Sequence, residues 1–340
     1  MLVGAAIVFL FVIVAVFADI VAPYDYKLQT RNEPSSPRST IRFITKDGSF
    51  RFRPFIYERE IADPLRMTYR EIETQEFPLG LFVRADRLKF LGLFETDIHF
   101  FGVIDRSANA PRLRLLGTDA LGRDIFSRLV NAIRFSLLVS PLGALLACLI
   151  GIFVGVVSGY ASRFADTVIM GVTDAMLSLP TLIIILAARA AFPLELPPLA
   201  AGLLMVSLFA LAGWAEMARL TRGLVVSTKE REYVLAAKAT GVSGSRILFR
   251  HILPNISVPL ITQATLIVPA FLIAETALSF LGVGLQEPEP SLGNLLSTAS
   301  ELTLLRERPL ELLSPAICIF LCVIGIRLLA DGMKQNSPTA

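Results

Sequence analysis

The chain has 340 residues, of which 54% are hydrophobic and only 18% are charged, and its mean hydropathy is +0.64. A soluble globular domain cannot carry that much apolar surface, so a cytosolic enzyme is excluded and a membrane protein is expected. The formal net charge of +3 provides no excess basic field for a nucleic acid. Cys148, Cys318 and Cys322 lie in apolar stretches, which argues against a disulfide framework and a zinc site.

Six charge-poor runs are candidates for membrane-spanning helices, each of which needs about 20 mainly apolar residues. The first, residues 1–18, lacks the basic flank of a signal peptide, so we interpret it as an uncleaved anchor. The other five are predicted within 135–162, at 164–191, between Glu195 and Glu216, at 256–280 and at 312–330.

Charges in the short loops predict the orientation of these spans. Residues 218–255 carry seven Lys or Arg against two acids, so this loop is expected in the cytoplasm. Residues 281–311 carry five Glu against two Arg and are expected outside. Counting back along the chain, both termini are then cytoplasmic, and the polar block 19–134 is external.

The external block is predicted to be rich in β-strands. Residues 41–45 and 49–53 flank Lys46-Asp47-Gly48, and Asp-Gly tolerates the positive φ of a tight hairpin turn. The block could dock an external partner or simply cap the membrane domain, and the sequence favours neither.

The basic loop 218–255 has the local pattern of two short helices joined by a turn. Ser227 and Glu230 match a capping box that would begin the first helix. Gly241 suits the left-handed residue that ends a helix. Ser243 can then cap a second helix, which Pro254 is expected to end.

Motifs for covalent chemistry are missing from the sequence. It has no phosphate-binding loop ending in Lys-Ser/Thr, so this chain is not expected to bind ATP. It has two histidines, His99 and His251, and no Gly-x-Ser-x-Gly elbow. We therefore predict that the chain is not an enzyme and binds no metal or cofactor.

The spacing of Ala236-Ala237, Gly241 and Leu253-Pro254 resembles the signature loop of ATP-binding-cassette (ABC) import permeases. In that family, the loop forms a coupling helix that sits in a groove of the ATPase subunit. The resemblance implies these ATPase-coupling residues: Glu232, Tyr233, Ala236, Ala237, Thr240, Gly241, Leu253 and Pro254. Leu235 occupies the position of the family's acid, which puts an ion pair there in doubt; Glu232 lies one turn away.

A second stretch, residues 116–129, is similar to the motif of dipeptide and oligopeptide import permeases, specifically their C-type subunit. Its motif residues are Gly117, Thr118, Asp119, Gly122, Arg123 and Asp124. Residues 213–214, 231–234, 250–255 and 275–282 agree with the same family. The resemblance covers about 1–28 and 112–331, and the insert at roughly 30–111 departs from it.

The resemblance implies an all-α membrane protein with six transmembrane helices, of the type I ABC importer permease kind. A β-rich external insert would lie between helices 1 and 2. The expected parts are helix 1 at 1–18, the insert at 19–111 and a permease core at 112–340. The core would hold helices 2–6 and the coupling loop.

The function implied is that of a permease subunit in a bacterial inner-membrane importer of dipeptides or oligopeptides. Its partners would be a second permease subunit, ABC ATPase subunits that bind ATP and Mg²⁺, an external solute-binding protein and membrane lipid. Other cargo, such as nickel, an oligosaccharide or a modified peptide, remains open, as do a secondary transporter and a membrane scaffold.

Several residues inside the predicted spans are further candidates. A charge at the bilayer centre costs about 3 kcal/mol on insertion scales, so Asp174 and Glu275 are possible pathway residues unless they lie at the interface. Three glycines spaced by four, Gly151, Gly155 and Gly159, predict close helix packing against a partner that the sequence does not identify. Pro180 and Pro269 are expected to bend or loosen their helices.

Overall fold

A computed structural model describes residues 1–335 apart from 65–66, 91–93, 106, 108–109 and 299–307. Part of the acidic loop 281–311 therefore lies outside the described residues. The chain divides into two compact units. The helical unit holds Met1–Phe9, Leu137–Gly284 and Ile319–Ala340, and the sheet unit holds Leu10–Ser136 and Leu285–Cys318.

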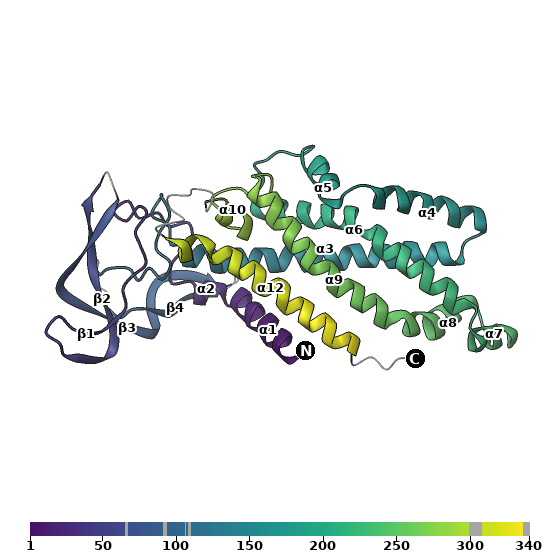
Figure 1. Cartoon of the computed structure of the whole chain (residues 1–340), viewed down its shortest axis with the longest axis horizontal. Helices are drawn as coiled ribbons and strands as arrows, with labels where there is room; N and C mark the ends of the chain where they lie inside the picture. The colour runs from purple at the N-terminus through teal and green to yellow at the C-terminus, as the bar shows by residue number, and fades with distance from the viewer. Residues whose placement is uncertain (65–66, 91–93, 106, 108–109, 299–307, 336–340) are drawn as a thin grey trace. The chain divides into compact units, whose positions relative to one another are not determined.

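The helices follow the apolar runs of the sequence (Figure 1). They are α1 (Leu2–Val16), α2 (Ala18–Val21), α3 (Ile125–Tyr160), α4 (Arg163–Ser178), α5 (Thr181–Arg189), α6 (Pro198–Lys229), α7 (Glu232–Ala239), α8 (Gly244–Ile247), the π-helix η1 (Leu248–Ile252), α9 (Leu253–Phe280), α10 (Leu292–Ser297) and α12 (Pro309–Gln335). Helices α1, α3 and α12 contribute residues to both units.

Four helical segments are long and apolar enough to cross a membrane. They are Ile125–Tyr160, Pro198–Lys229, Gly244–Phe280 and Pro309–Met333, and the pair α4–α5 makes a fifth if it forms one span. Helix α1 has 15 residues, which at 1.5 Å per residue reach about 22 Å, less than the ~30 Å of a hydrocarbon core. By length and composition, the described residues thus provide four or five spans.

The third predicted run is broken at Pro180, as expected. Leu179 and Pro180 adopt extended backbone conformations, and the axes of α4 and α5 differ by 86°. Proline causes this break because its ring fixes φ and its nitrogen cannot donate a helical hydrogen bond. Pro269 lies inside α9, which continues through it.

The four strands form one antiparallel sheet in the order β1-β2-β3-β4. They are β1 (Arg42–Ile44), β2 (Phe50–Asp63), β3 (Thr68–Phe90) and β4 (Phe94–Val103). The predicted hairpin at Lys46-Asp47-Gly48 is confirmed, with Gly48 at φ +79°. Ile56, Phe77, Leu79 and Leu113 form a small core beside the sheet, and Phe101 packs against it.

The glycine strip of α3 packs against α6 in the same chain. A Cβ added to Gly151 would lie 2.5 Å from the carbonyl oxygen of Trp214, and one added to Gly155 would lie 2.5 Å from that of Ala218. At Gly159 the nearest atom, Cγ1 of Val225, would be 2.7 Å away. Only glycine permits this approach of two backbones, so the strip fixes α6 against α3.

Candidate functional site

The basic loop 218–255 begins inside α6, which is longer than the sequence pattern predicts. The capping box at Ser227 and Glu230 is wrong, because α6 continues to Lys229 and the Ser227 hydroxyl donates to the carbonyl of Leu224 within that helix. Helix α7 begins instead after Arg231, whose extended backbone (φ −72°, ψ 142°) marks the helix start.

Helix α7 is short, and Val234 is its one buried side chain. Val234 is buried, whereas Glu232, Tyr233 and Ala236 are exposed and Leu235 is 51% exposed. Leu235 stands where the resembled family has an acid, so the side chain exposed there is apolar.

Gly241 ends this helix in the left-handed conformation, as predicted. Its φ is +81°, the backbone N–H of Gly241 donates to Lys238, and that of Val242 donates to Ala237. A Cβ at Gly241 would have no atom within 4 Å, so the requirement for glycine comes from φ alone.

The second part of the loop differs from the prediction at Pro254. Ser243 is the N-cap of α8, as expected, although its side chain makes no capping bond. Pro254 does not end a helix; it lies in the first turn of α9, directly after the π-helical η1. The wider π turn relieves the proline ring of its clash with a carbonyl one turn back. Phe249 on η1 is 69% exposed.

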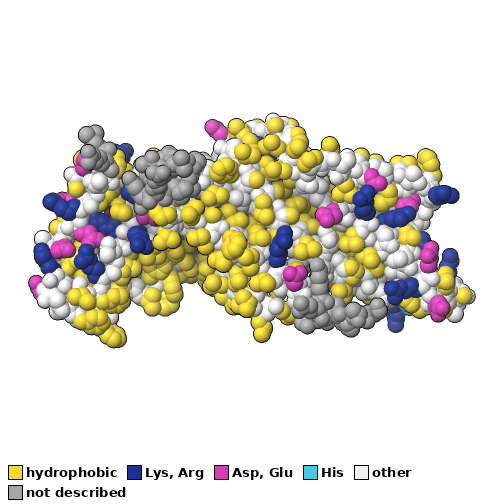
Figure 2. All heavy atoms as spheres, viewed as in Figure 1, with side chains coloured by type: hydrophobic (Ala, Val, Ile, Leu, Met, Phe, Trp, Pro, Cys, Tyr) yellow, Lys and Arg dark blue, Asp and Glu magenta, His cyan; other side chains and the backbone are white. Residues whose placement is uncertain are grey.

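Two ion pairs join α4 to the last part of α6, and a hydrogen bond joins α3 to it. Arg219 pairs with Asp174, and Arg222 pairs with Asp166 at 2.5 Å. The Lys229 ammonium donates to the carbonyl of Gly159 at 2.7 Å. Figure 2 shows charged side chains gathered where α7 and α8 lie and mainly hydrophobic side chains along the helices. Asp174 therefore serves first as a partner of α6.

A cleft of about 480 Å³ lies within the helical unit, where α5, α6 and α9 meet the end of α4. Apolar side chains form most of its lining, together with Thr181, Glu216 and Gln263. Gln263 Nε2 donates to Glu216 Oε1 at 2.8 Å. The sequence analysis did not identify this pair, because Glu216 appeared there only as the limit of an apolar run.

Glu275, the other predicted pathway residue, does not line the cleft. Its side chain is 0% exposed within this chain, and its Oε1 accepts a hydrogen bond from Ser279 Oγ at 2.8 Å. Its neighbours Ala274 and Ala277 line the cleft instead. Helix α9 thus turns Glu275 away from the space that Glu216 faces.

The motif at 117–124 forms a tight loop that starts α3. Gly117 and Gly122 both have φ +73°, and Thr118 and Asp124 form a β-bridge between them. A Cβ at Gly122 would lie 2.1 Å from the carbonyl oxygen of Thr30, so the loop is packed directly on an earlier segment. Asp124 then caps α3 by accepting from Ser127 N at 2.8 Å.

Two buried arginines, Arg123 and Arg128, join this loop to Glu287 within the sheet unit. Arg123 donates to Asp119 at 2.7 Å and to Glu287 at 2.5 Å, and Arg128 donates to the other oxygen of Glu287 at 2.8 Å. Burial raises the pKa of Asp124 above its usual range, against the opposing charge of Arg114. Within the described residues, the contacts of this motif hold the start of α3 against neighbouring segments of the sheet unit, and none of them indicates catalysis.

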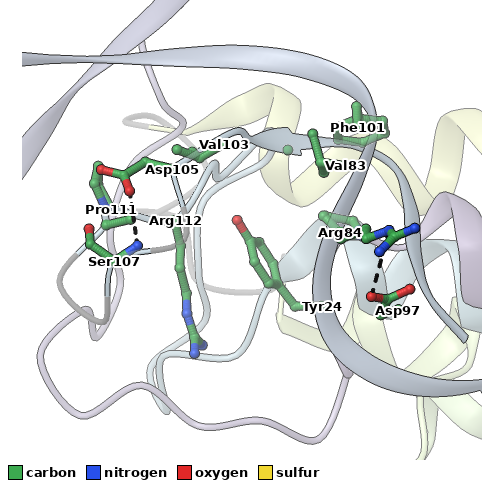
Figure 3. A pocket seen from close by; sticks show the side chains of 13 residues that line it. Tyr24, Val83, Arg84, Asp97, Phe101, Val103, Asp105, Ser107, Pro111 and Arg112 are labelled. Atoms are coloured by element: carbon green, nitrogen blue, oxygen red, sulfur yellow. Dashed lines mark hydrogen bonds and ion pairs between the residues drawn. The ribbon is translucent and has the colours of Figure 1, made fainter.

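A separate pocket of about 380 Å³ lies beside the sheet (Figure 3). Arg84 lies 3.9 Å from Asp97 in its lining, the side chain of Asp105 accepts from Ser107 N at 2.9 Å, and Arg112 donates to the Thr30 hydroxyl at 3.2 Å. Burial raises the pKa of Tyr24, whose hydroxyl oxygen accepts from Leu113 N at 2.7 Å. Tyr24 is therefore neutral and structural.

The sequence of the chain is similar to that of a known protein family. Residues 151–337 match the model described as "Binding-protein-dependent transport system inner membrane component". The chain is 36% identical over 219 residues to the dipeptide transport system permease protein DppC of Alkalihalophilus pseudofirmus, covering 64% of this chain and 69% of that one. It is also 36% identical over 222 residues to the di/tripeptide transport system permease protein DppC of Pseudomonas aeruginosa, covering 65% and 70%.

Among solved structures, a chain of the MetNI methionine ABC transporter in inward-facing conformations is similar at 15% identity. The TM-score is 0.48, and the match covers 61% of this chain and 95% of that chain.

Proposed function

Because the chain belongs to the family of binding-protein-dependent transport system inner membrane components, we propose that it is one permease subunit of an ATP-driven importer of dipeptides or oligopeptides. The relatives reported above carry dipeptide or di/tripeptide transport in their names. The observation that carries the proposal is helix α7, which exposes Tyr233 and Leu235 and is followed by the left-handed turn at Gly241.

In this proposal, α7 is the coupling helix that docks on a cytoplasmic ATPase subunit. Tyr233, Leu235 and Ala236 form the contact, and the two small residues Ala236 and Ala237 let the ATPase backbone approach closely. ATP and Mg²⁺ bind to the ATPase, and this chain does no covalent chemistry. Leu235 in place of the family's acid makes the contact mainly apolar.

The topology we propose has six spans, both termini in the cytoplasm and the β-rich insert outside. The bent pair α4–α5 counts as one span, and α1 as another, extended by interfacial residues. The helical unit forms half of the pathway, a second permease subunit forms the other half, and an external solute-binding protein delivers the peptide.

Site-directed cross-linking tests the coupling contact. Leu235→Cys places a reactive thiol on α7, and Leu281→Cys, with a parent side chain 58% exposed at the far end of α9, is the matched control. In membranes of the native host, we expect Leu235→Cys to cross-link to an ABC ATPase, identified by mass spectrometry, and Leu281→Cys not to. Equal cross-linking of both variants, or of neither, would refute the contact.

Peptide uptake tests the cargo. Cells that lack the gene are expected to lose uptake of a radiolabelled tripeptide and to regain it with the wild-type gene. Excess unlabelled peptide should compete with this uptake, whereas nickel and oligosaccharides should not. If only nickel or only an oligosaccharide competed, the proposal of a peptide cargo would be wrong.

A further inference from the structure

The cleft between α5, α6 and α9 contains one acidic side chain among mainly apolar neighbours. Glu216 faces the cleft from α6, Gln263 faces it from α9, and Thr181 lies at the start of α5. The remaining lining is apolar or glycine, and includes Leu182, Leu266, Ile267 and Phe271. The cleft thus combines a mainly apolar wall with three polar side chains, of which Glu216 alone is charged.

The charge of Glu216 is not neutralised within the described part of the chain. Its carboxylate accepts a hydrogen bond from the neutral amide of Gln263, and among the described residues no Lys, Arg or His nitrogen lies within 4.0 Å of it. Arg219, one turn further along α6, is already paired with Asp174. Glu216 is exposed, so its carboxylate is accessible to a positively charged group that enters the cleft.

The geometry also indicates what kind of cation fits. Gln263 uses an amide N–H on Glu216, which leaves its own carbonyl oxygen as an acceptor beside the carboxylate. Two neighbouring oxygen acceptors suit an ammonium group, which has three N–H donors. Every unmodified peptide carries such a group at its N-terminus, where the α-amino pKa is about 8 and the amine is mainly charged at pH 7.

The rest of the cleft suits the variable part of a peptide. Its apolar wall can contact side chains of different shapes without demanding a particular hydrogen bond. The break at Pro180 interrupts one wall, and interrupted helices in transporters commonly lie at the substrate. One group in the cleft would then bind the peptide's amino group, and the apolar wall would accept different peptide side chains.

We propose that Glu216, positioned by Gln263, binds the N-terminal ammonium of the peptide during its passage. This inference rests on the proposed peptide transport and adds the group that this permease recognises. It makes Glu216 a specificity-determining residue, with Gln263 as its positioning residue.

The test uses the complete transporter in proteoliposomes with its binding protein, and compares tri-alanine with N-acetyl-tri-alanine. Glu216→Gln keeps the shape but removes the charge. Glu195→Gln, an exposed carboxylate outside the cleft, is the matched control. Because all variants share one binding protein, only a change in the ratio of the two uptake rates is informative.

We expect Glu216→Gln to lower the ratio of free to acetylated peptide uptake by about tenfold, the loss of roughly one half-exposed charge pair, through KM rather than kcat. Gln263→Leu should lower it by a smaller factor, and Glu195→Gln should leave it unchanged. An unchanged ratio in an active Glu216→Gln transporter would overturn the inference.

Two further outcomes are separable. If the wild-type transporter moves neither peptide, the proposed function fails, and the inference fails with it. If Glu216→Gln instead loses the second permease subunit on purification, while Glu195→Gln retains it, the carboxylate pairs with that subunit and the inference is overturned on its own.

Discussion

The contact between the glycine strip of α3 and helix α6 allows a sharp test of the packing. Gly155→Ala adds one methyl group, which would lie 2.5 Å from the carbonyl oxygen of Ala218 and 2.6 Å from Cβ of Thr221. Gly223→Ala is the control, because it adds the same methyl group to α6 itself where no atom lies within 4 Å.

The expected difference follows from two terms of opposite sign. Alanine favours a helix over glycine by about 1 kcal/mol, so Gly223→Ala should be neutral or slightly stabilising. At Gly155 the same gain is opposed by overpacking, which costs about 1–3 kcal/mol because the helices must separate by roughly 1 Å to reach ordinary contact. The two variants should therefore differ by about 1–3 kcal/mol.

Thermal unfolding of the purified chain, followed by fluorescence-detected size exclusion, measures this difference. At 2–4 °C per kcal/mol for a large domain, we expect Gly155→Ala to unfold about 4 °C below Gly223→Ala. Adding Gly151→Ala to the Gly155→Ala variant should lower Tm by less than Gly151→Ala does alone, because helices already forced apart accommodate a second methyl group. Equal Tm values for Gly155→Ala and Gly223→Ala would show that α6 does not approach α3 as described.

Two further predictions concern the loops. Gly241→Ala should cost about 1–2 kcal/mol locally because φ is +81°, and should reduce peptide-stimulated ATP hydrolysis with the protein still inserted; Gly244→Ala, equally uncrowded and without a positive φ, should be normal. Arg123→Ala should leave Glu287 held by one arginine in place of two and lower Tm more than Arg112→Ala does, as limited proteolysis of 285–291 and thermal unfolding would show.

The positions of most helices could be predicted because the bilayer sets a minimum length for an apolar run. The ends of the helices could not be predicted, because tertiary packing extends or shortens a helix beyond its local sequence signals. Helix α6 runs past Ser227 since its last turns are packed on α3, with Val225 against Gly159 and Lys229 bonded to that residue's carbonyl. The position of Pro254 in the first turn of α9 could not be predicted either, because the sequence carries no signal for the π turn that precedes it.

The candidate site divides in the same way. The turn at Gly241 follows from local backbone chemistry, so one residue type predicts it. Glu216 and Gln263 are 47 residues apart in the sequence and lie on two different helices, so the local sequence around one does not indicate the other. The strip on α3 predicted close packing, but its partner α6 is defined only by the fold.

The link between α7 and the cleft depends on how rigidly α6 is held. Helix α6 contains Glu216 in the cleft and Arg219 and Arg222 in the ion pairs, and it ends just before α7. Exposed ion pairs contribute only about 0.2–1 kcal/mol each, so these two cannot by themselves make α6 and α4 move together. The backbone contacts at Gly151 and Gly155 hold α6 against a different helix, α3, at the close distance that glycine permits. A displacement of α7 should therefore reach the cleft through α3 and α6 as one body, and Gly155→Ala should impair transport even where the ion pairs remain intact.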